Sequence, residues 1–296
     1  MPQISDYDKY KYDYTRYWQD DKVERSYEHR AEEIALAKLL PKKCDWFCDL
    51  GAGFGRLFPI YKNRAKNIIL ADYSIEGLKK FLPNNSNVYR IALNAYHLPF
   101  RDDSMDCLMS IRLIHHIVEP KIFVAELGRV IGSGGNLVLE FANKKHFLAQ
   151  IRYLLGRRKI NPFNEKPEKH GDDLFYNFHP KHIEKLLREI GFRVRKSLSV
   201  SNFRHQIFKE LPRQALLGLE NISQSLLSPI AFGPSIFLQA EKRADLGFKI
   251  QDLRKIEDIL CCPKCKGELK FGKNKIDCVK CGLEFQIIDS IYDFRI

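Results

Sequence analysis

The 296-residue sequence contains no long apolar run. Its longest apolar stretch, Leu216–Leu238, is interrupted by Glu220 and Pro229, whereas a helix that crosses a bilayer needs about 20 consecutive apolar residues. The first twenty residues are polar and rich in tyrosine, unlike the apolar core of a secretion signal. We therefore expect a cytoplasmic protein with no transmembrane segment.

Cysteine is scarce outside one short stretch, since five of the eight cysteines lie between Cys261 and Cys281. Without an export signal, such clustering favours metal binding over disulfides. A composition of 45% hydrophobic and 29% charged residues excludes intrinsic disorder. The length suits one main domain with a small appendage.

Acidic residues are outnumbered, with 37 Asp and Glu against 49 Lys and Arg, which leaves a net charge of +12. Most of this excess lies in residues 144–213, which carry 17 positive and 7 negative side chains. An anionic partner would explain this concentration. A solvated, lysine-rich surface explains it equally well, and the sequence leaves both interpretations open.

Short apolar segments alternate with segments of helical periodicity, which predict helices over residues 22–40, 56–63, 75–81, 121–130 and 180–190. This alternation predicts an α/β fold with a doubly wound, mostly parallel sheet of seven strands. The expected strands cover residues 46–50, 67–71, 88–93, 106–110, 136–141, 192–197 and 235–240. An amphipathic segment, residues 205–228, is compatible with a lid, a dimer face, a membrane-surface helix or a core-packed helix pair.

A glycine-rich turn follows the first expected strand and reads Asp49-Leu50-Gly51-Ala52-Gly53-Phe54-Gly55. Glycine is needed where the backbone adopts positive φ or where a ligand comes close. Dinucleotide sites place glycine where this chain has Arg56. This departure and the acid before the glycines favour a cationic ligand such as S-adenosylmethionine over a pyrophosphate.

Two further polar residues follow the next strands. Asp72 closes the second strand, where a carboxylate can accept hydrogen bonds from both ribose hydroxyls, and Asn94 follows the third, where its amide oxygen can accept from an adenine amine. Because the carboxyl ends of parallel strands meet at one edge of a sheet, these positions predict a single cofactor site.

Residues 45–141 resemble the class I S-adenosylmethionine-dependent methyltransferases, in the broad methyltransferase type 11-like subgroup. The resemblance rests on CDLGAGFGRL, LADYS, LNAYHLPFRDDSMDCLMS and RLIHHI. It implies a Rossmann-like fold and S-adenosylmethionine as cofactor, although the family usually has Asp where this chain has Asn94. The implied cofactor-binding residues are Asp49, Gly51, Ala52, Gly53, Gly55, Asp72, Tyr73, Asn94 and Ala95.

The candidate catalytic residues follow the fourth expected strand and are His116, His115 and Arg112. The resemblance implies that a histidine at the position of His116 acts as a general base in some members, while a histidine that caps and packs a helix is the structural alternative. Family members often use an N-terminal aromatic segment as a lid. The expected substrate-binding residues are Tyr14, Tyr17, Trp18, Tyr176 and His179, for which purely structural roles are the alternative.

Two CxxC turns, separated by twelve residues, place Cys262, Cys265, Cys278 and Cys281 at a spacing typical of a structural zinc site. A disulfide or redox pair is the alternative. The surrounding run is similar to the zinc-ribbon activators that partner methyltransferases acting on RNA and proteins. We therefore expect a methyltransferase domain over residues 1–250 and a fused zinc ribbon over residues 254–296. Within the larger domain we expect an N-terminal cap over 1–40 and a variable acceptor-side region over 143–234.

The leading functional prediction is a methyltransferase that acts on a small-molecule or lipid-like acceptor. RNA or a translation-related protein is the alternative acceptor, favoured by the basic region and the ribbon. Enzymes that methylate amide or amine nitrogens in RNA and protein often carry Asn/Asp-Pro-Pro-aromatic after the fourth strand, where this chain has Ser110-Ile111-Arg112-Leu113. A catalytically inactive scaffold is the third alternative.

Overall fold

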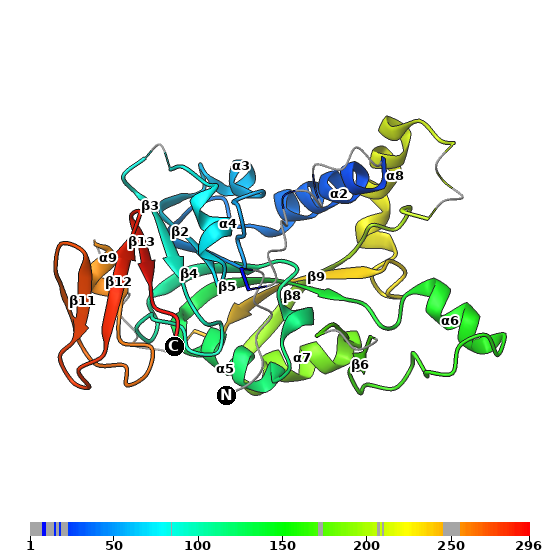
Figure 1. Ribbon diagram of the computed structural model, residues 1–296. Coiled ribbons are helices and arrows are strands. Elements are labelled where there is room, and N and C mark those ends of the chain that lie inside the picture. Colours follow the sequence, from blue (N-terminus) through cyan, green and yellow to red (C-terminus); the bar gives the residue numbers. More distant parts are fainter. Residues whose placement is uncertain are drawn as a thin grey trace.

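The computed structural model describes residues 8, 9, 15, 18, 23–83, 85–170, 174–205, 208, 210–244 and 255–296. One twisted sheet runs through the molecule, with its strands in the order β10-β11-β12-β13-β3-β2-β1-β4-β5-β9-β8 (Figure 1). The seven strands of the main domain are β1 (Cys44–Leu50), β2 (Ala65–Asp72), β3 (Val88–Ala92), β4 (Met105–Ser110), β5 (Ile131–Ala142), β8 (Phe192–Val200) and β9 (Ser235–Lys242).

These seven strands confirm the doubly wound sheet expected from the sequence. The five neighbouring strands β3, β2, β1, β4 and β5 pair in parallel. Among the seven, only β9 runs antiparallel to its two neighbours, β5 and β8. The central strands are continuous apolar runs because helices cover both of their faces, so no solvent-facing alternation is needed. Phe47 and Cys48, adjacent in β1, are both fully buried and belong to different core clusters.

Helices divide between the two faces of the sheet (Figure 1). One face is covered by α2 (Val23–Leu39), α3 (Phe58–Tyr61) and α4 (Ile75–Lys79), and the other by α5 (Pro120–Val130) and α7 (Pro180–Glu189). The periodicity of the sequence predicted α2, α4, α5 and α7 closely, whereas α3 is shorter than the expected helix over residues 56–63. A 3₁₀ turn, η1 (Ile114–His116), precedes α5.

The cysteine-rich segment, residues 255–296, forms a ribbon that is joined to the main sheet. It consists of α9 (Ile256–Ile259), β10 (Leu269–Phe271), β11 (Lys275–Cys278), β12 (Glu284–Ile288) and β13 (Ile291–Asp293). The last of these strands pairs in parallel with β3, with Ile291 opposite Arg90 and Asp293 opposite Ala92. The seven-stranded sheet thereby becomes an eleven-stranded one, and the edge of β3 is covered rather than left exposed.

Residues 143–234, for which we expect an acceptor-side role, contain elements that the sequence pattern did not reveal. They are α6 (Phe147–Leu154) and a two-stranded hairpin of β6 (Glu168–Lys169) and β7 (Tyr176–Asn177). The amphipathic segment forms one helix, α8 (Arg213–Leu226), which packs on α2 and β8. No helix in the described ranges combines the length and apolar composition that crossing a membrane requires.

Candidate cofactor and metal sites

The glycine turn lies directly after β1, at the carboxyl edge of the parallel strands. Gly51, Gly53 and Gly55 all have positive φ, at 90°, 55° and 75°. A Cβ at Gly55 would lie 2.5 Å from the Phe81 ring, so side chains are excluded there by packing as well as by conformation. The amides of Gly51 and Ala52 both donate to the carbonyl of Ala71, which ties the turn to β2.

Two carboxylates flank this turn, and one of them holds it in place. Asp72, at the end of β2, accepts from the Gly53 amide at 2.7 Å and from the Ser74 amide at 2.9 Å. Asp49, at the end of β1, is buried and accepts from the Tyr61 hydroxyl at 2.7 Å. Burial raises the pKa of Asp49 to about 7 and also raises that of Asp72, since the charged form loses its hydration.

The loop after β3 meets the end of the ribbon. Asn94 is buried, its Oδ1 accepts from the Tyr96 amide at 3.0 Å, and its Nδ2 donates to the Ile296 carbonyl at 3.4 Å. Arg295 donates to the Tyr73 carbonyl at 3.2 Å, and its guanidinium lies 5.5 Å from the Tyr73 ring centre. The ribbon therefore contacts two of the expected cofactor positions, which the sequence did not indicate. Ala95, next to Asn94, is partly buried and packs against the hydrophobic core on the side of the sheet that α5 and α7 cover.

Asp8 joins this edge from the N-terminal part of the chain. Its carboxylate accepts from the Ser74 hydroxyl and, at 2.9 Å, from the Ile75 amide at the start of α4. A carboxylate is favourable at this position because the first amides of a helix lack partners within the helix. Arg295 lies 3.7 Å from Asp8, so the ribbon and the N-terminal segment meet beside Ser74.

A network of charges connects β4, the glycine turn and α2. Arg112 has a φ of 58°, which is uncommon outside glycine. Its amide donates to the buried Glu140 at 2.8 Å, and its guanidinium donates to Glu32 at 2.6 Å and Glu28 at 3.0 Å. Arg56 of the glycine turn also pairs with Glu32, at 2.6 Å. Arg112 is thus engaged by carboxylates, and its predicted catalytic role stays a prediction.

Sequence reasoning missed Glu28 and Glu32, although a signal was present. Like charges four residues apart disfavour an isolated helix, so a partner was to be expected for this pair. Both side chains are buried, and the two arginines lower the pKa of Glu32 against the opposing effect of burial. Trp18 lies over the same arginines, with its ring centre 3.7 Å from the Arg56 guanidinium and 4.7 Å from that of Arg112.

The two histidines occupy η1 and pack against the loop before β7. His116 Nδ1 lies 2.9 Å from the Leu174 carbonyl oxygen, and its ring centre lies 4.3 Å from that of His115. A carbonyl only accepts, so this contact places a proton on Nδ1 and the lone pair of neutral His116 on Nε2. His115 is buried, and its burial, together with His116 and Arg112 nearby, holds its pKa well below the ordinary value.

Two buried polar atoms near the end of β4 have no hydrogen-bond partner within the described part of the chain. They are Oγ of Ser110, the last residue of β4, and Nδ1 of His115. Burying such an atom without a partner costs about 1–3 kcal/mol, so unsatisfied groups gather where a ligand or water is to be bound. This edge of the sheet therefore has polar groups available for a ligand.

The expected substrate residues that the structure describes lie on different elements. Tyr176 is half-buried in β7, and His179 is buried as the N-cap of α7, where its Nδ1 accepts from the Lys181 amide at 3.2 Å. Tyr14 and Tyr17 lie outside the described residues. Of the three that the structure describes, Trp18 is the one whose contacts place it beside the glycine turn, through Arg56.

The four ligand cysteines expected from the sequence come together. The sulfur atoms of Cys262, Cys265, Cys278 and Cys281 all lie within 4.8 Å of one another, with 3.7 Å between Cys262 and Cys281 and 3.4 Å between Cys265 and Cys278. A tetrahedral zinc site with Zn–S bonds of about 2.3 Å separates its sulfurs by about 3.8 Å. The cluster therefore fits a zinc ion.

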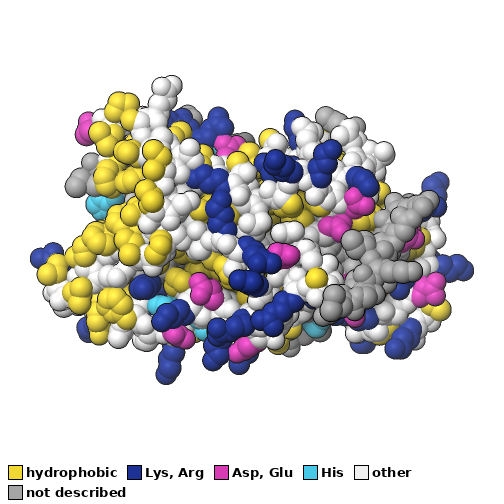
Figure 2. Space-filling model, turned by 180° about the vertical axis from the view of Figure 1, so that it is seen from behind, with side chains coloured by type: hydrophobic (Ala, Val, Ile, Leu, Met, Phe, Trp, Pro, Cys, Tyr) yellow, Lys and Arg dark blue, Asp and Glu magenta, His cyan; other side chains and the backbone are white. Residues whose placement is uncertain are grey.

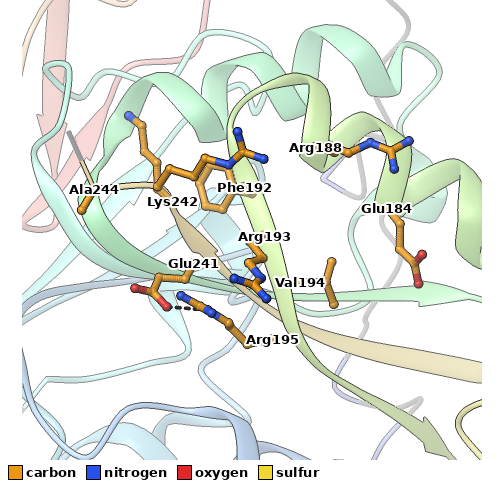
Figure 3. Close-up of a pocket in the computed structure, with 10 residues that line it drawn as sticks. Glu184, Arg188, Phe192, Arg193, Val194, Arg195, Glu241, Lys242 and Ala244 are labelled. Carbon is orange, nitrogen blue, oxygen red and sulfur yellow. Dashed lines mark hydrogen bonds and ion pairs between the residues drawn. The ribbon is translucent and has the colours of Figure 1, made fainter.

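A separate groove of about 660 Å³ lies at the amino end of β8, away from the glycine turn (Figure 3). It contains none of the residues expected from the sequence. Arg195 pairs with Glu241 at 2.7 Å, whereas no ion pair forms at Arg188, Arg193 or Arg243 within the described ranges. The lining is Glu184, Arg188, Phe192, Arg193, Val194, Arg195, Glu241, Lys242, Arg243 and Ala244.

Comparison with known proteins agrees with this architecture. Residues 48–139 match the methyltransferase domain family. An uncharacterized protein of Methanocaldococcus jannaschii is 31% identical over 121 residues, which are 40% of this chain and 51% of that protein. A demethylmenaquinone methyltransferase of Paenarthrobacter aurescens is 32% identical over 96 residues, which are 32% and 38% of the two chains. The chain thus spans about half or less of these two curated relatives.

Among solved structures, a chain from the complex of a Haloferax volcanii methyltransferase with the Trm112 methyltransferase activator shares the fold. The TM-score is 0.53 at 16% identity, over 80% of this chain and 98% of that one. At this identity the likeness concerns the fold alone. The chain therefore has a Rossmann-like methyltransferase fold, in which residues 48–139 match the methyltransferase domain family and a cysteine-rich ribbon extends the sheet.

Proposed function

We propose that the protein is an S-adenosylmethionine-dependent methyltransferase that acts on a small-molecule or lipid-like acceptor. One observation carries the proposal: the glycine turn, Asp72 and Asn94 lie at the carboxyl ends of three adjacent strands, and Asp72 holds the turn through the Gly53 amide. The positive φ values of Gly51, Gly53 and Gly55 give the turn a backbone conformation that glycine adopts readily and other residues rarely do.

In this proposal the residues around the turn divide the cofactor among them. Asp72 and Tyr73 would hold the ribose, Asn94 and Ala95 the adenine, and Asp49 and the glycine turn the amino acid end. Asn94 already uses its amide nitrogen on Ile296 and one lone pair on Tyr96. A carbonyl oxygen has a second lone pair, so the adenine amine can still donate to Oδ1.

When bound, S-adenosylmethionine supplies an electrophilic methyl group on a sulfonium. The chain then has to orient the acceptor and, if the nucleophile carries a proton, accept that proton. The Leu174 carbonyl fixes the tautomer of His116 so that Nε2 can act as the base. Holding the two reactants in line contributes the larger part of the acceleration.

The acceptor class rests on several features. This chain has Ser110-Ile111-Arg112-Leu113 where enzymes that methylate amide and amine nitrogens in RNA and protein often carry an Asn/Asp-Pro-Pro-aromatic motif. Trp18 lies over Arg56 and Arg112, and the Phe175 ring centre lies 4.5 Å from that of His115, so aromatic rings flank the residues that follow β4. The similar enzyme of Paenarthrobacter aurescens is a demethylmenaquinone methyltransferase, so a lipid-like acceptor has a precedent among the relatives.

RNA or a translation-related protein is the second candidate acceptor, and the groove of Figure 3 favours it. Five cations and two carboxylates line this groove, and three of the arginines form no ion pair within the described residues. Phosphates or acidic side chains would complement this surface. The Haloferax volcanii neighbour was solved with the Trm112 activator, and the ribbon of this chain resembles that class of activator.

We propose that the ribbon binds structural zinc and stabilises the cofactor site. A segment of this size has too small a core to fold alone, so four cysteine ligands would hold it together. Its last strand is the neighbour of β3, and Arg295 and Ile296 reach Tyr73 and Asn94. The folding of the ribbon is thereby coupled to the shape of the proposed adenine end of the site.

Transfer of labelled methyl groups tests the function and separates its alternatives. The protein is incubated with methyl-labelled S-adenosylmethionine and a cell extract divided into RNA, protein and lipid or small-molecule fractions. Label in the last fraction supports the proposal, and label in RNA or protein supports the second candidate. Absence of transfer to every fraction, by a protein that binds the cofactor, would favour a scaffold.

A further inference from the structure

The acceptor-side region carries most of the exposed apolar side chains. Of the 15 large hydrophobic residues that are exposed among the described residues, 11 lie between residues 147 and 230. Figure 2 shows hydrophobic side chains gathered at the end of the molecule where Figure 1 places α6 and α8. We call this surface the apolar face, and it consists of Phe147, Leu148, Leu154, Leu155, Ile160, Phe163, Leu211, Leu219, Ile222, Leu226 and Ile230.

Helix α8 has its polar side inward. Glu220 and Gln224 are fully buried, while Leu219, Ile222 and Leu226 are 48%, 65% and 71% exposed. These three leucine and isoleucine positions follow the i, i+3, i+7 spacing of one helix face. At these positions α8 therefore departs from the usual distribution for a surface helix, in which apolar residues face inward and polar residues outward.

Hydrogen bonds hold the inward side of α8. Glu220 accepts from the Tyr27 hydroxyl at 2.6 Å and from the amides of Ser201 and Asn202 at 2.8 and 3.0 Å. Gln224 donates to the Ala31 carbonyl at 2.8 Å. These bonds fix the orientation of the helix, so its apolar stripe faces outward as a consequence of the fold.

Helix α6 continues this surface. Its first residue, Phe147, stacks on Phe232 with ring centres 4.8 Å apart and donates its amide to the Phe232 carbonyl at 2.9 Å. Phe232 lies in the loop after α8 that also carries Ile230. At the other end of α6, Leu154 and Leu155 are 73% and 61% exposed. The stripe of α8, the loop and the outer side of α6 therefore form one continuous face.

Cations accompany the apolar face. Arg152, Arg157 and Lys159 are exposed and form no ion pair within the described ranges, while Arg158 pairs with the buried Glu168. Exposed leucine, isoleucine and phenylalanine beside unpaired Arg and Lys are the composition of segments that lie in the interface of an anionic bilayer. A second copy of the chain docked on this face would bring these cations toward one another.

We propose that the apolar face docks on an anionic lipid bilayer. Leu154, Leu155, Ile222 and Leu226 enter the boundary between headgroups and acyl chains, and the cations of the α6 end contact lipid phosphates. This inference rests on surface chemistry and stands apart from the proposed methyl transfer. Since α6 follows β5 at the carboxyl end of the sheet, the bilayer would lie on the side of the molecule that holds the glycine turn.

Flotation with lipid vesicles tests the proposal. The full-length protein is mixed with vesicles of phosphatidylcholine alone or with phosphatidylglycerol added. We expect flotation with the anionic vesicles and a loss of it at 0.5 M salt, about three times physiological ionic strength, where charges are screened over about 4 Å. The double variants I222S/L226S and L154S/L155S each lower the partition coefficient by about tenfold or more.

The matched controls are L82S and V279S, which remove apolar side chains that are 76% and 67% exposed elsewhere. Both should float like the wild type, and all variants should keep the wild-type melting temperature because the replaced side chains do not pack in the core. The proposal is overturned if the wild type stays with the solution in the presence of anionic vesicles, or if both double variants float as well as the controls. It is also overturned if light scattering shows a wild-type dimer that the double variants abolish without any vesicle binding.

Discussion

The amide of Gly53 donates to the carboxylate of Asp72 at 2.7 Å and thereby joins the glycine turn after β1 to the end of β2. The other carboxylate oxygen accepts from the Ser74 amide at 2.9 Å. A single side chain thus fixes the backbone of two loops that meet at the expected cofactor site. This arrangement makes Asp72 the residue at which the site is most easily disrupted.

Replacement of Asp72 should therefore weaken cofactor binding. Both D72A and D72N lose at least one charge-assisted bond to a backbone amide, each of which contributes about 1.5–3 kcal/mol. We expect the Kd for S-adenosylmethionine, measured by calorimetry, to rise about tenfold or more. D45A is the matched control because Asp45 is exposed at the other end of the sheet, where it pairs with Lys66. Equal affinities of D72A and D45A would contradict the role of Asp72.

Loss of zinc should lower both stability and cofactor affinity. The ribbon is held to β3 by strand pairing and by the bond from the Phe294 amide to the Ala92 carbonyl at 2.8 Å. Unfolding of the ribbon would free this edge beside Asn94. We expect metal analysis to find one zinc ion per chain, and chelation or C265S to lower the melting temperature and raise the Kd for S-adenosylmethionine.

The control for the zinc prediction is C44S, because Cys44 lies in β1, far from the four-sulfur cluster. It should retain a full equivalent of zinc and unchanged cofactor binding. If C265S behaves like C44S in zinc content and melting temperature, the cluster is not a structural metal site.

His116 should affect turnover and leave binding unchanged. H116A removes the nitrogen that the Leu174 contact orients as a base, and a positioned base contributes about 100-fold or more to rate. We expect kcat to fall by about that factor, with little change in the Kd for S-adenosylmethionine. H170A is the control, since His170 is exposed in the neighbouring hairpin. Full turnover of H116A would assign His116 a structural role.

The buried Asp49 predicts a dependence of stability on pH. Its pKa in the folded protein is about 7, above the ordinary value of 3.8. Between these values the folded state keeps a proton that the unfolded state loses, so the free energy of unfolding falls as pH rises from about 4 to 7. The contribution of Asp49 to the free energy of unfolding is complete below about pH 4 and is lost above about pH 7.

The variant D49N tests this contribution because asparagine does not titrate and can still accept from Tyr61. Urea denaturation at several pH values between 4 and 8 should show a wild-type free energy of unfolding that declines more than that of D49N, by up to about 4 kcal/mol. Parallel curves for the two proteins would show that Asp49 is ionised in the folded state throughout this range.

The sequence was sufficient to predict the parts of the fold that depend on local pattern. Apolar runs bounded by glycine and charged residues marked the strands from β1 to β5, because strands buried on both faces have to be apolar throughout. The four cysteines also came together as their spacing predicted. In both cases a short stretch of chain contains the physical cause of the structure.

Contacts between segments that are distant in the chain could not be predicted from the sequence pattern. The pairing of β13 with β3 joins residues about 200 positions apart and depends on backbone groups that no side-chain pattern encodes. The inward polar side of α8 was missed for a related reason, since Glu220 is satisfied by Tyr27, 193 residues earlier in the chain. Without those partners, an apolar stripe at helical spacing is reasonably interpreted as the buried side.

Calorimetric titration of S-adenosylmethionine into the folded, zinc-loaded protein tests the central claim most directly. The account predicts saturable binding of one cofactor per chain, weakened in D72A and unaffected in D45A. A wild-type protein that is folded by circular dichroism and yet releases no binding heat at several temperatures would contradict the assignment of the glycine turn as a cofactor site.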